Sequence, residues 1–132
     1  MIDYSKMVTA EDKFEQAKDT KRREITSACQ AAIDGGFSFS GHVFDSDPRS
    51  QTNIIGTANA VQAGISLPDG FTWRTQANEN VPMDDQGIIA LGAALLEHVN
   101  ACYARSWQLK AIVDSADSIS DLDAINWVNT AA

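Results

Sequence analysis

The amino-acid sequence predicts an α+β fold that is mainly helical: three to four helices, one of them long and central, and two short β-hairpins. Helix-capping residues precede four segments in which apolar residues recur at helical spacing. Apolar and polar residues alternate in two further segments that are bounded by turn residues. With 44% hydrophobic and 21% charged residues over a length of 132, the chain has the composition of one ordinary globular domain.

The first helix is predicted over residues 9–34. Thr9 and Asp12 have the spacing of a capping box, and Gly35 with Gly36 ends the helix. The second half of this segment carries a regular apolar stripe, whereas the first half offers only Phe14 and Ala17 among polar residues. We therefore divide the chain into a polar helical arm, residues 1–22, and a single globular domain, residues 23–132. Such an arm is expected to be solvated or packed against a second chain.

The middle of the chain predicts a hairpin and a second helix. Residues 37–44 alternate apolar and polar side chains around Gly41, as in a short β-hairpin. Asp47 is a suitable N-cap, and Pro48 suits the first helical position. The helix that follows is expected to end at Gly64.

A second hairpin and two more helices complete the prediction. Residues 71–75 and 81–83 are expected to be strands, with Pro82 on an edge. Asp84 caps a long helix over residues 85–114. Apolar residues recur at every seventh position of this helix: Ile88, Leu95, Cys102 and Leu109. Such a line suits a hydrophobic core, a helical bundle or a contact between subunits.

The last helix is predicted over residues 118–127. Ser118 and Asp121 have the spacing of a helix cap. Ile119, Leu122 and Ile125 are expected to form the inner face of this helix.

The charge excludes several classes of partner. The formal net charge is −8, whereas phosphate binding depends on dense Lys and Arg, so nucleic acid and anionic membranes are not expected partners. Residues 1–8 lack the pattern of a signal peptide, and no stretch approaches the roughly 18 apolar residues of a membrane span. Cys29 and Cys102 fall on apolar helical positions, which favours buried thiols in a reducing compartment.

The sequence contains no motif of an active site or cofactor site. His98 and Cys102 share a helix face but form no complete set of metal ligands, and neither metal nor cofactor is expected. Asp47 and Asp84 are accounted for as helix caps. An alternative hypothesis is a small metal- or ligand-binding domain, or an enzyme, with a carboxylate site near Asp45 and Asp47.

Aromatic and apolar residues suggest where a partner would bind. Trp107 lies off the apolar line of the long helix, and Trp127 lies near the end of the chain. The segment before the first helix carries two further candidates, and the polar arm carries one. The candidate partner-binding residues are Tyr4, Met7, Phe14, Trp107 and Trp127.

Several local segments carry a family resemblance. The most distinctive are residues 44–47 (Phe-Asp-Ser-Asp) and 50–54 (Ser-Gln-Thr-Asn-Ile) with Gly56. Residues 22–26, 31–37, 71–75 and 118–127 match the rest of the pattern. Residues 43–127 thereby resemble a domain of unknown function that recurs in phage tail and tail-fibre-associated proteins. The chain is similar to stand-alone members that look like tail-fibre assembly proteins.

The resemblance implies a non-enzymatic phage tail protein that mediates tail-fibre assembly or attachment through protein contacts. The protein could be a chaperone that leaves the fibre after assembly or an adaptor that stays in the virion. The expected location is therefore the host cytoplasm during assembly or the virion tail. The expected partner is a fibre or other tail protein, and a homo-oligomer is expected by analogy with fibres. An acidic regulator directed at a host protein is a further alternative, since the net charge is −8.

Overall fold

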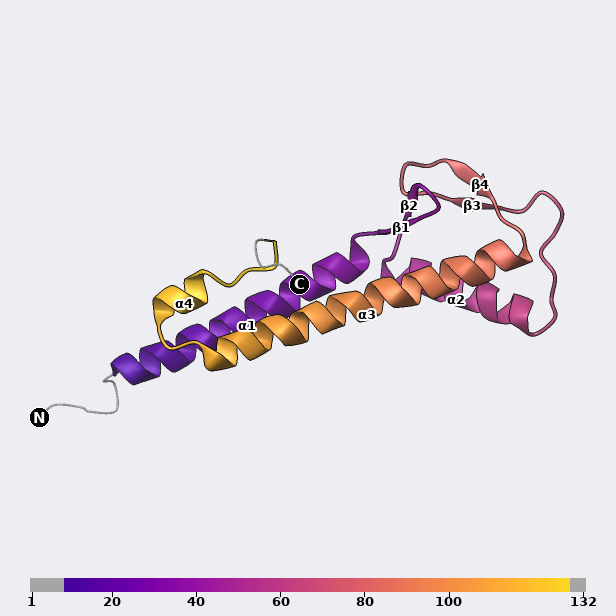
Figure 1. Cartoon of the computed structure of the whole chain (residues 1–132). Helices are drawn as coiled ribbons and strands as arrows, with labels where there is room; N and C mark the ends of the chain where they lie inside the picture. Colours follow the sequence, from indigo (N-terminus) through magenta and orange to yellow (C-terminus); the bar gives the residue numbers. More distant parts are fainter. Residues whose placement is uncertain (1–8, 129–132) are drawn as a thin grey trace, which may run out of the picture. The chain divides into compact units, whose positions relative to one another are not determined.

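The computed structural model describes residues 9–128 (Figure 1). Within this range the chain forms four helices and four strands, so the fold is α+β and mainly α, as predicted. The helices are α1 (Ala10–Asp34), α2 (Pro48–Gln62), α3 (Asp85–Ser115) and α4 (Ile119–Asp123). The strands are β1 (Phe37–Phe39), β2 (His42–Phe44), β3 (Thr72–Arg74) and β4 (Asn80–Pro82).

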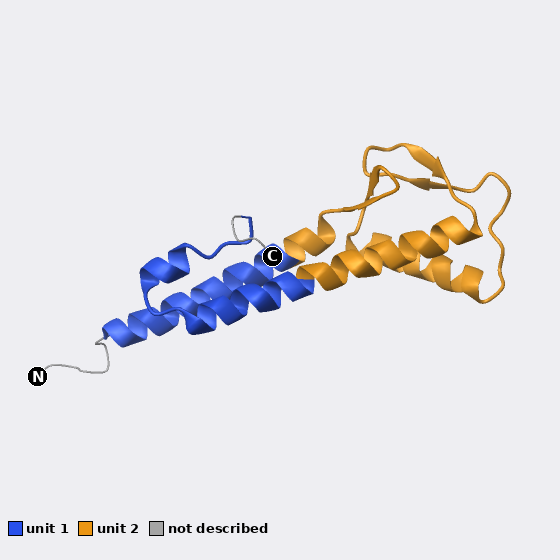
Figure 2. Ribbon diagram, viewed as in Figure 1, with its two compact units in different colours: residues 1–29, 103–132 blue, residues 30–102 orange. Residues whose placement is uncertain are grey.

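The chain folds into two compact units, coloured separately in Figure 2. Unit 1 consists of residues 1–29 and 103–132, and unit 2 consists of residues 30–102. Both α1 and α3 therefore contribute residues to each unit. These boundaries differ from the division at residue 22 that the sequence suggested, because residues 1–29 belong to the same unit as the end of the chain.

Unit 1 is built on antiparallel contact between α1 and α3. Arg22 on α1 donates to the Asp114 carboxylate on α3 over 2.8 Å, and the Asp114 hydrogen bond raises the pKa of Arg22. The Cys29 thiol, seven residues after Arg22 on α1, is hydrogen-bonded to the side chain of Ser106, which lies eight residues before Asp114 on α3. The two helices therefore run in opposite directions. The core of this unit is an apolar cluster from α1, α3 and the end of the chain: Ile25, Leu109, Val113, Leu122 and Ile125.

The start of α1 corrects one expectation and confirms another. Phe14 and Ala17 are half-buried and pack against the core of unit 1, so the expectation that this part of the helix is solvated or packed against a second chain was wrong for these two residues, whereas most of residues 9–20 are exposed. It failed because the segments that cover the two side chains lie about a hundred residues away in the sequence. The capping box is confirmed: the Asp12 N–H donates to Thr9 Oγ1 over 3.0 Å, and the Thr9 N–H donates to the Asp12 carboxylate over 3.3 Å.

Helix α4 starts as predicted but is shorter than expected. Ser118 Oγ accepts from the Asp121 N–H over 3.1 Å. The helix ends at Asp123 instead of residue 127, and Ile119 is exposed instead of forming part of the inner face. Beyond α4 the chain leaves the helical path, buries Ile125 in the core and brings the carbonyl of Trp127 to Arg105.

Unit 2 places two separate hairpins beside α2 and part of α3. Strands β1 and β2 pair antiparallel with Phe37 opposite Phe44, and β3 and β4 pair with Thr72 opposite Pro82. Pro82 thus ends a strand that has a neighbour on one side, which agrees with the expected edge position. The core is formed by both hairpins and both helices: Phe37, Phe44, Ile54, Met83, Ile88, Leu91 and Leu95.

The Ser46 side chain connects the end of α1 to the start of α2. Its buried Oγ donates to the Ile33 carbonyl over 2.6 Å and accepts from the Gly36 N–H over 2.7 Å. The Ser46 carbonyl accepts from the Gln51 side chain over 2.7 Å. Gly36 has φ +107°, and a Cβ there would lie 2.8 Å from the Gln76 amide, so only glycine suits this turn. One hydroxyl therefore satisfies a donor and an acceptor at the helix end.

Helix α3 combines length with apolar composition. In the described part of the chain it is the helix long and apolar enough to cross a membrane, contrary to the expectation that no segment approaches such a span. The core helix of a soluble protein passes the same test, and Ile88 and Leu95 lie in the core of unit 2 while Leu109 and Val113 lie in that of unit 1. Helix α3 is therefore only weak evidence for a membrane span.

The first prediction concerns the Ser46 hydroxyl. Ser46→Ala should lower the free energy of unfolding by about 1–3 kcal/mol, because it leaves the Gly36 N–H and the Ile33 carbonyl without their shared partner. Urea unfolding followed by circular dichroism measures this change. Ser38→Ala, at an exposed position on β1, is the matched control. Equal stabilities of the two variants would show that the Ser46 bridge contributes little.

Candidate functional site

An exposed pair of aromatic rings lies on α3 within unit 1. The rings of Tyr103 and Trp107 are stacked, with centroids 6.2 Å apart and planes inclined by 19°. Their residues are 43% and 67% exposed, respectively. The two positions are four residues apart, so their side chains share one helix face. The pair is a preformed apolar surface of the kind that anchors protein contacts.

The predicted partner-binding residues differ in how exposed they are in the structure. Trp107 is the most exposed described residue among them, as expected from its place off the apolar line of α3. Tyr4 and Met7 lie outside the described residues. Tyr103 was not predicted, although its spacing of four from Trp107 was a signal that could have found it.

Trp127 and Phe14 already have contacts inside unit 1. Both are half-buried and pack against the core of that unit. The Arg105 guanidinium lies 5.3 Å from the ring centroid of Trp127 and donates to its carbonyl. The Lys18 ammonium lies 4.8 Å from the ring centroid of Phe14. A partner role for either ring stays a prediction, and each has a role in packing as well.

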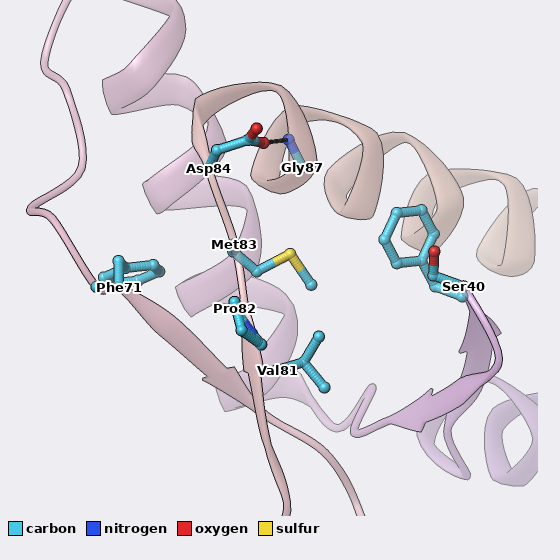
Figure 3. Close-up of a pocket in the computed structure, with 9 residues that line it drawn as sticks. Ser40, Phe71, Val81, Pro82, Met83, Asp84 and Gly87 are labelled. Carbon is cyan, nitrogen blue, oxygen red and sulfur yellow. Dashed lines mark hydrogen bonds between the residues drawn. The ribbon is translucent and has the colours of Figure 1, made fainter.

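A shallow pocket in unit 2 lies beside the start of α3 (Figure 3). It has a volume of about 440 Å³. Strand β4 and the residues after it contribute Val81, Pro82 and Met83, Phe71 precedes β3, and Ser40 comes from the turn between β1 and β2 (Figure 3). This apolar lining suits a hydrophobic side chain better than a charged substrate.

The acidic residue of this pocket is engaged in capping. Among the described residues that line the pocket, Asp84 carries the titratable group. Its Oδ1 accepts from the Gly87 N–H over 2.7 Å, the bond drawn in Figure 3, which confirms Asp84 as the cap of α3. The carboxylate is thus used to begin the helix, and the pocket offers shape and apolar surface for binding.

Two further carboxylates, Asp45 and Asp47, lie just before α2. Asp47 occupies the N-cap position of α2 and Pro48 follows it, as predicted, but the Asp47 side chain makes no capping hydrogen bond. The hydrogen bond from Ser50 Oγ, 2.5 Å long, lowers the pKa of Asp47, so this group stays ionised further into the acid range. Asp45 is exposed. Within residues 9–128 no three His, Cys, Asp or Glu side chains gather as metal ligands would.

Comparison with known proteins gives a family. Residues 16–127 match the family described as Domain of unknown function (DUF4376). The chain belongs to this family. No curated protein and no solved structure matches the chain. The distinctive Phe-Asp-Ser-Asp segment of this DUF4376 domain includes Ser46, whose role in the structure is to connect α1 and α2.

The two cysteines of the DUF4376 domain are both buried. Burial raises the pKa of the Cys29 thiol, against smaller opposing effects of Ser106 and Lys110. A thiol with a raised pKa carries even less reactive thiolate at neutral pH than an ordinary cysteine. The geometry at Cys29 therefore favours packing over nucleophilic chemistry.

The second prediction concerns thiol reactivity. In the native protein at neutral pH, Cys29 and Cys102 should react with a thiol reagent at least about tenfold more slowly than a free cysteine, because both are buried. Absorbance with a chromogenic disulfide reagent follows the reaction. The same protein in denaturant, where both thiols should react at once, is the control. Fast reaction of the folded protein would contradict the buried positions.

Proposed function

We propose that this protein is a non-enzymatic component of a bacteriophage tail that mediates tail-fibre assembly or attachment through protein–protein contacts. The observation that carries the proposal is the stacked pair Tyr103 and Trp107 on the surface of unit 1. Two aromatic rings held in one orientation lose little conformational freedom on binding and remove a large apolar area from water. A protein partner that covers both rings would gain most of its binding energy there.

The phage-tail context rests on the resemblance of the local sequence segments. The segments at residues 44–47 and 50–54 are its most distinctive part. Their side chains contribute internal contacts, since Ser46 bonds to the end of α1 and Gln51 bonds to the Ser46 carbonyl. The resemblance therefore speaks for a shared fold, and its occurrence among tail proteins supports the same setting for this chain.

The third prediction tests the aromatic pair. Trp107→Ser should weaken binding to the tail-fibre protein encoded in the same genome by about tenfold or more, because an exposed ring that anchors a contact is lost. Calorimetry with the two purified proteins gives the dissociation constants. Ile112→Ser is the matched control, since Ile112 is an exposed apolar residue on the same helix and in the same unit.

Two results would count against the proposed function. Equal affinities of the Trp107 and Ile112 variants would show that the aromatic pair is not the anchor. A wild-type chain that binds no tail protein of the phage that encodes it, or that is encoded outside any phage or prophage genome, would contradict the tail setting. Immunodetection in purified virions then separates an adaptor, which is present, from an assembly chaperone, which is absent.

A further inference from the structure

A second exposed surface lies in unit 2, where α2 and α3 pack against each other. A groove of about 350 Å³ runs between these helices. Its residues come in equal numbers from the two helices: Ile55, Ala58, Asn59, Gln62, Ile89, Gly92, Ala93 and Leu96. We call this set the α2–α3 groove. None of its residues belongs to the aromatic pair.

The groove combines a low centre with raised apolar sides. A Cβ on Gly92 would lie 3.2 Å from the Cβ of Ala58, so the two helices meet closely through their smallest side chains. Ile55 and Leu96 border this contact and are 43% and 57% exposed. The same surface therefore carries both projecting side chains and a hollow that fits a projecting side chain.

The α2–α3 groove is also free of charge. Residues 50–62 of α2 and residues 86–96 of α3 contain no Asp, Glu, Lys or Arg, in a chain whose formal net charge is −8. Two copies of an acidic chain repel each other wherever their acidic surfaces meet. A contact made through uncharged surface avoids most of this repulsion and desolvates no ion.

The polar groups of the groove can pair with their own copies. Asn59 and Gln62 are the polar side chains that line it, and both are exposed amides. An amide carries donors and an acceptor, so it can hydrogen-bond to an identical amide. A carboxylate or an ammonium group cannot do this, because like charges repel. Shape, charge and hydrogen bonding of this surface are thus each compatible with an identical surface.

We propose that the α2–α3 groove is the interface of a two-fold symmetric homodimer. In a two-fold pair each copy presents the same surface, so a suitable surface must be complementary to itself. Leu96 of each copy would lie in the hollow over Gly92 and Ala58 of the other, and Asn59 would meet its own copy near the two-fold axis. This dimer is independent of the aromatic pair, so the inference goes beyond the proposed function.

The fourth prediction is an association measurement on the full chain. Sedimentation velocity over a concentration series should show a dimer for the wild type. Leu96→Glu should weaken dimerisation by about tenfold or more, because it places a carboxylate of each copy in an apolar contact. Ile65→Glu adds the same charge at an exposed apolar residue outside the groove, and this matched control should dimerise as the wild type does.

A charge-pairing experiment separates a lost interface from a damaged fold. Asn59 is exposed, so Asn59→Asp and Asn59→Lys should both fold, as circular dichroism can verify. Each variant alone should dimerise weakly, because like charges meet across the two-fold axis. An equimolar mixture should recover the dimer as a pair of unlike copies, since a carboxylate then faces an ammonium group.

Three outcomes would overturn the inference. The first is a wild type that remains monomeric throughout the concentration series, which would leave the groove for an unlike partner. The second is an equal effect of Leu96→Glu and Ile65→Glu, which would indicate unspecific association. The third is a mixture of the two Asn59 variants that associates no better than either alone. None of these outcomes bears on binding at Trp107, so the two proposals fail separately.

Discussion

Both hydrophobic cores depend on one apolar line along α3. Ile88 and Leu95 supply the core of unit 2, and Leu109 and Val113 supply that of unit 1. A helix gains most of its stability in a protein from such packing, so this line determines which side of α3 is buried. The residues on its other sides are then left at the surface. The exposure of Leu96, Tyr103 and Trp107 follows from this choice of buried face.

The most recognisable sequence motif serves the fold. In the segment Phe-Asp-Ser-Asp the serine is buried and completes the backbone hydrogen bonding at the end of α1, while Asp47 occupies the N-cap position of α2. Buried backbone groups need partners, and a short polar side chain at a turn supplies them at low conformational cost. A cluster of polar residues can therefore be a signature of a family without being the site of its chemistry.

The surfaces left by this packing differ in the partners that they suit. The pair Tyr103 and Trp107 offers two large, exposed aromatic rings to a partner. The α2–α3 groove offers uncharged, self-compatible surface in an acidic chain. The two surfaces use different residues in different units, so the proposed dimerisation and the proposed binding of a tail component would not compete for the same residues.

The sequence by itself determined the fold class, the starts of the helices and the buried line of α3. These features depend on residues within a few positions of one another, as in the capping pairs Thr9–Asp12 and Ser118–Asp121. The tertiary structure alone decided that Phe14 packs inside unit 1, that α4 stops at Asp123 and that α2 and α3 share a groove. Each of these features depends on contacts between segments that are distant in the chain. The local spacing of residues does not predict which distant side chains will pack together.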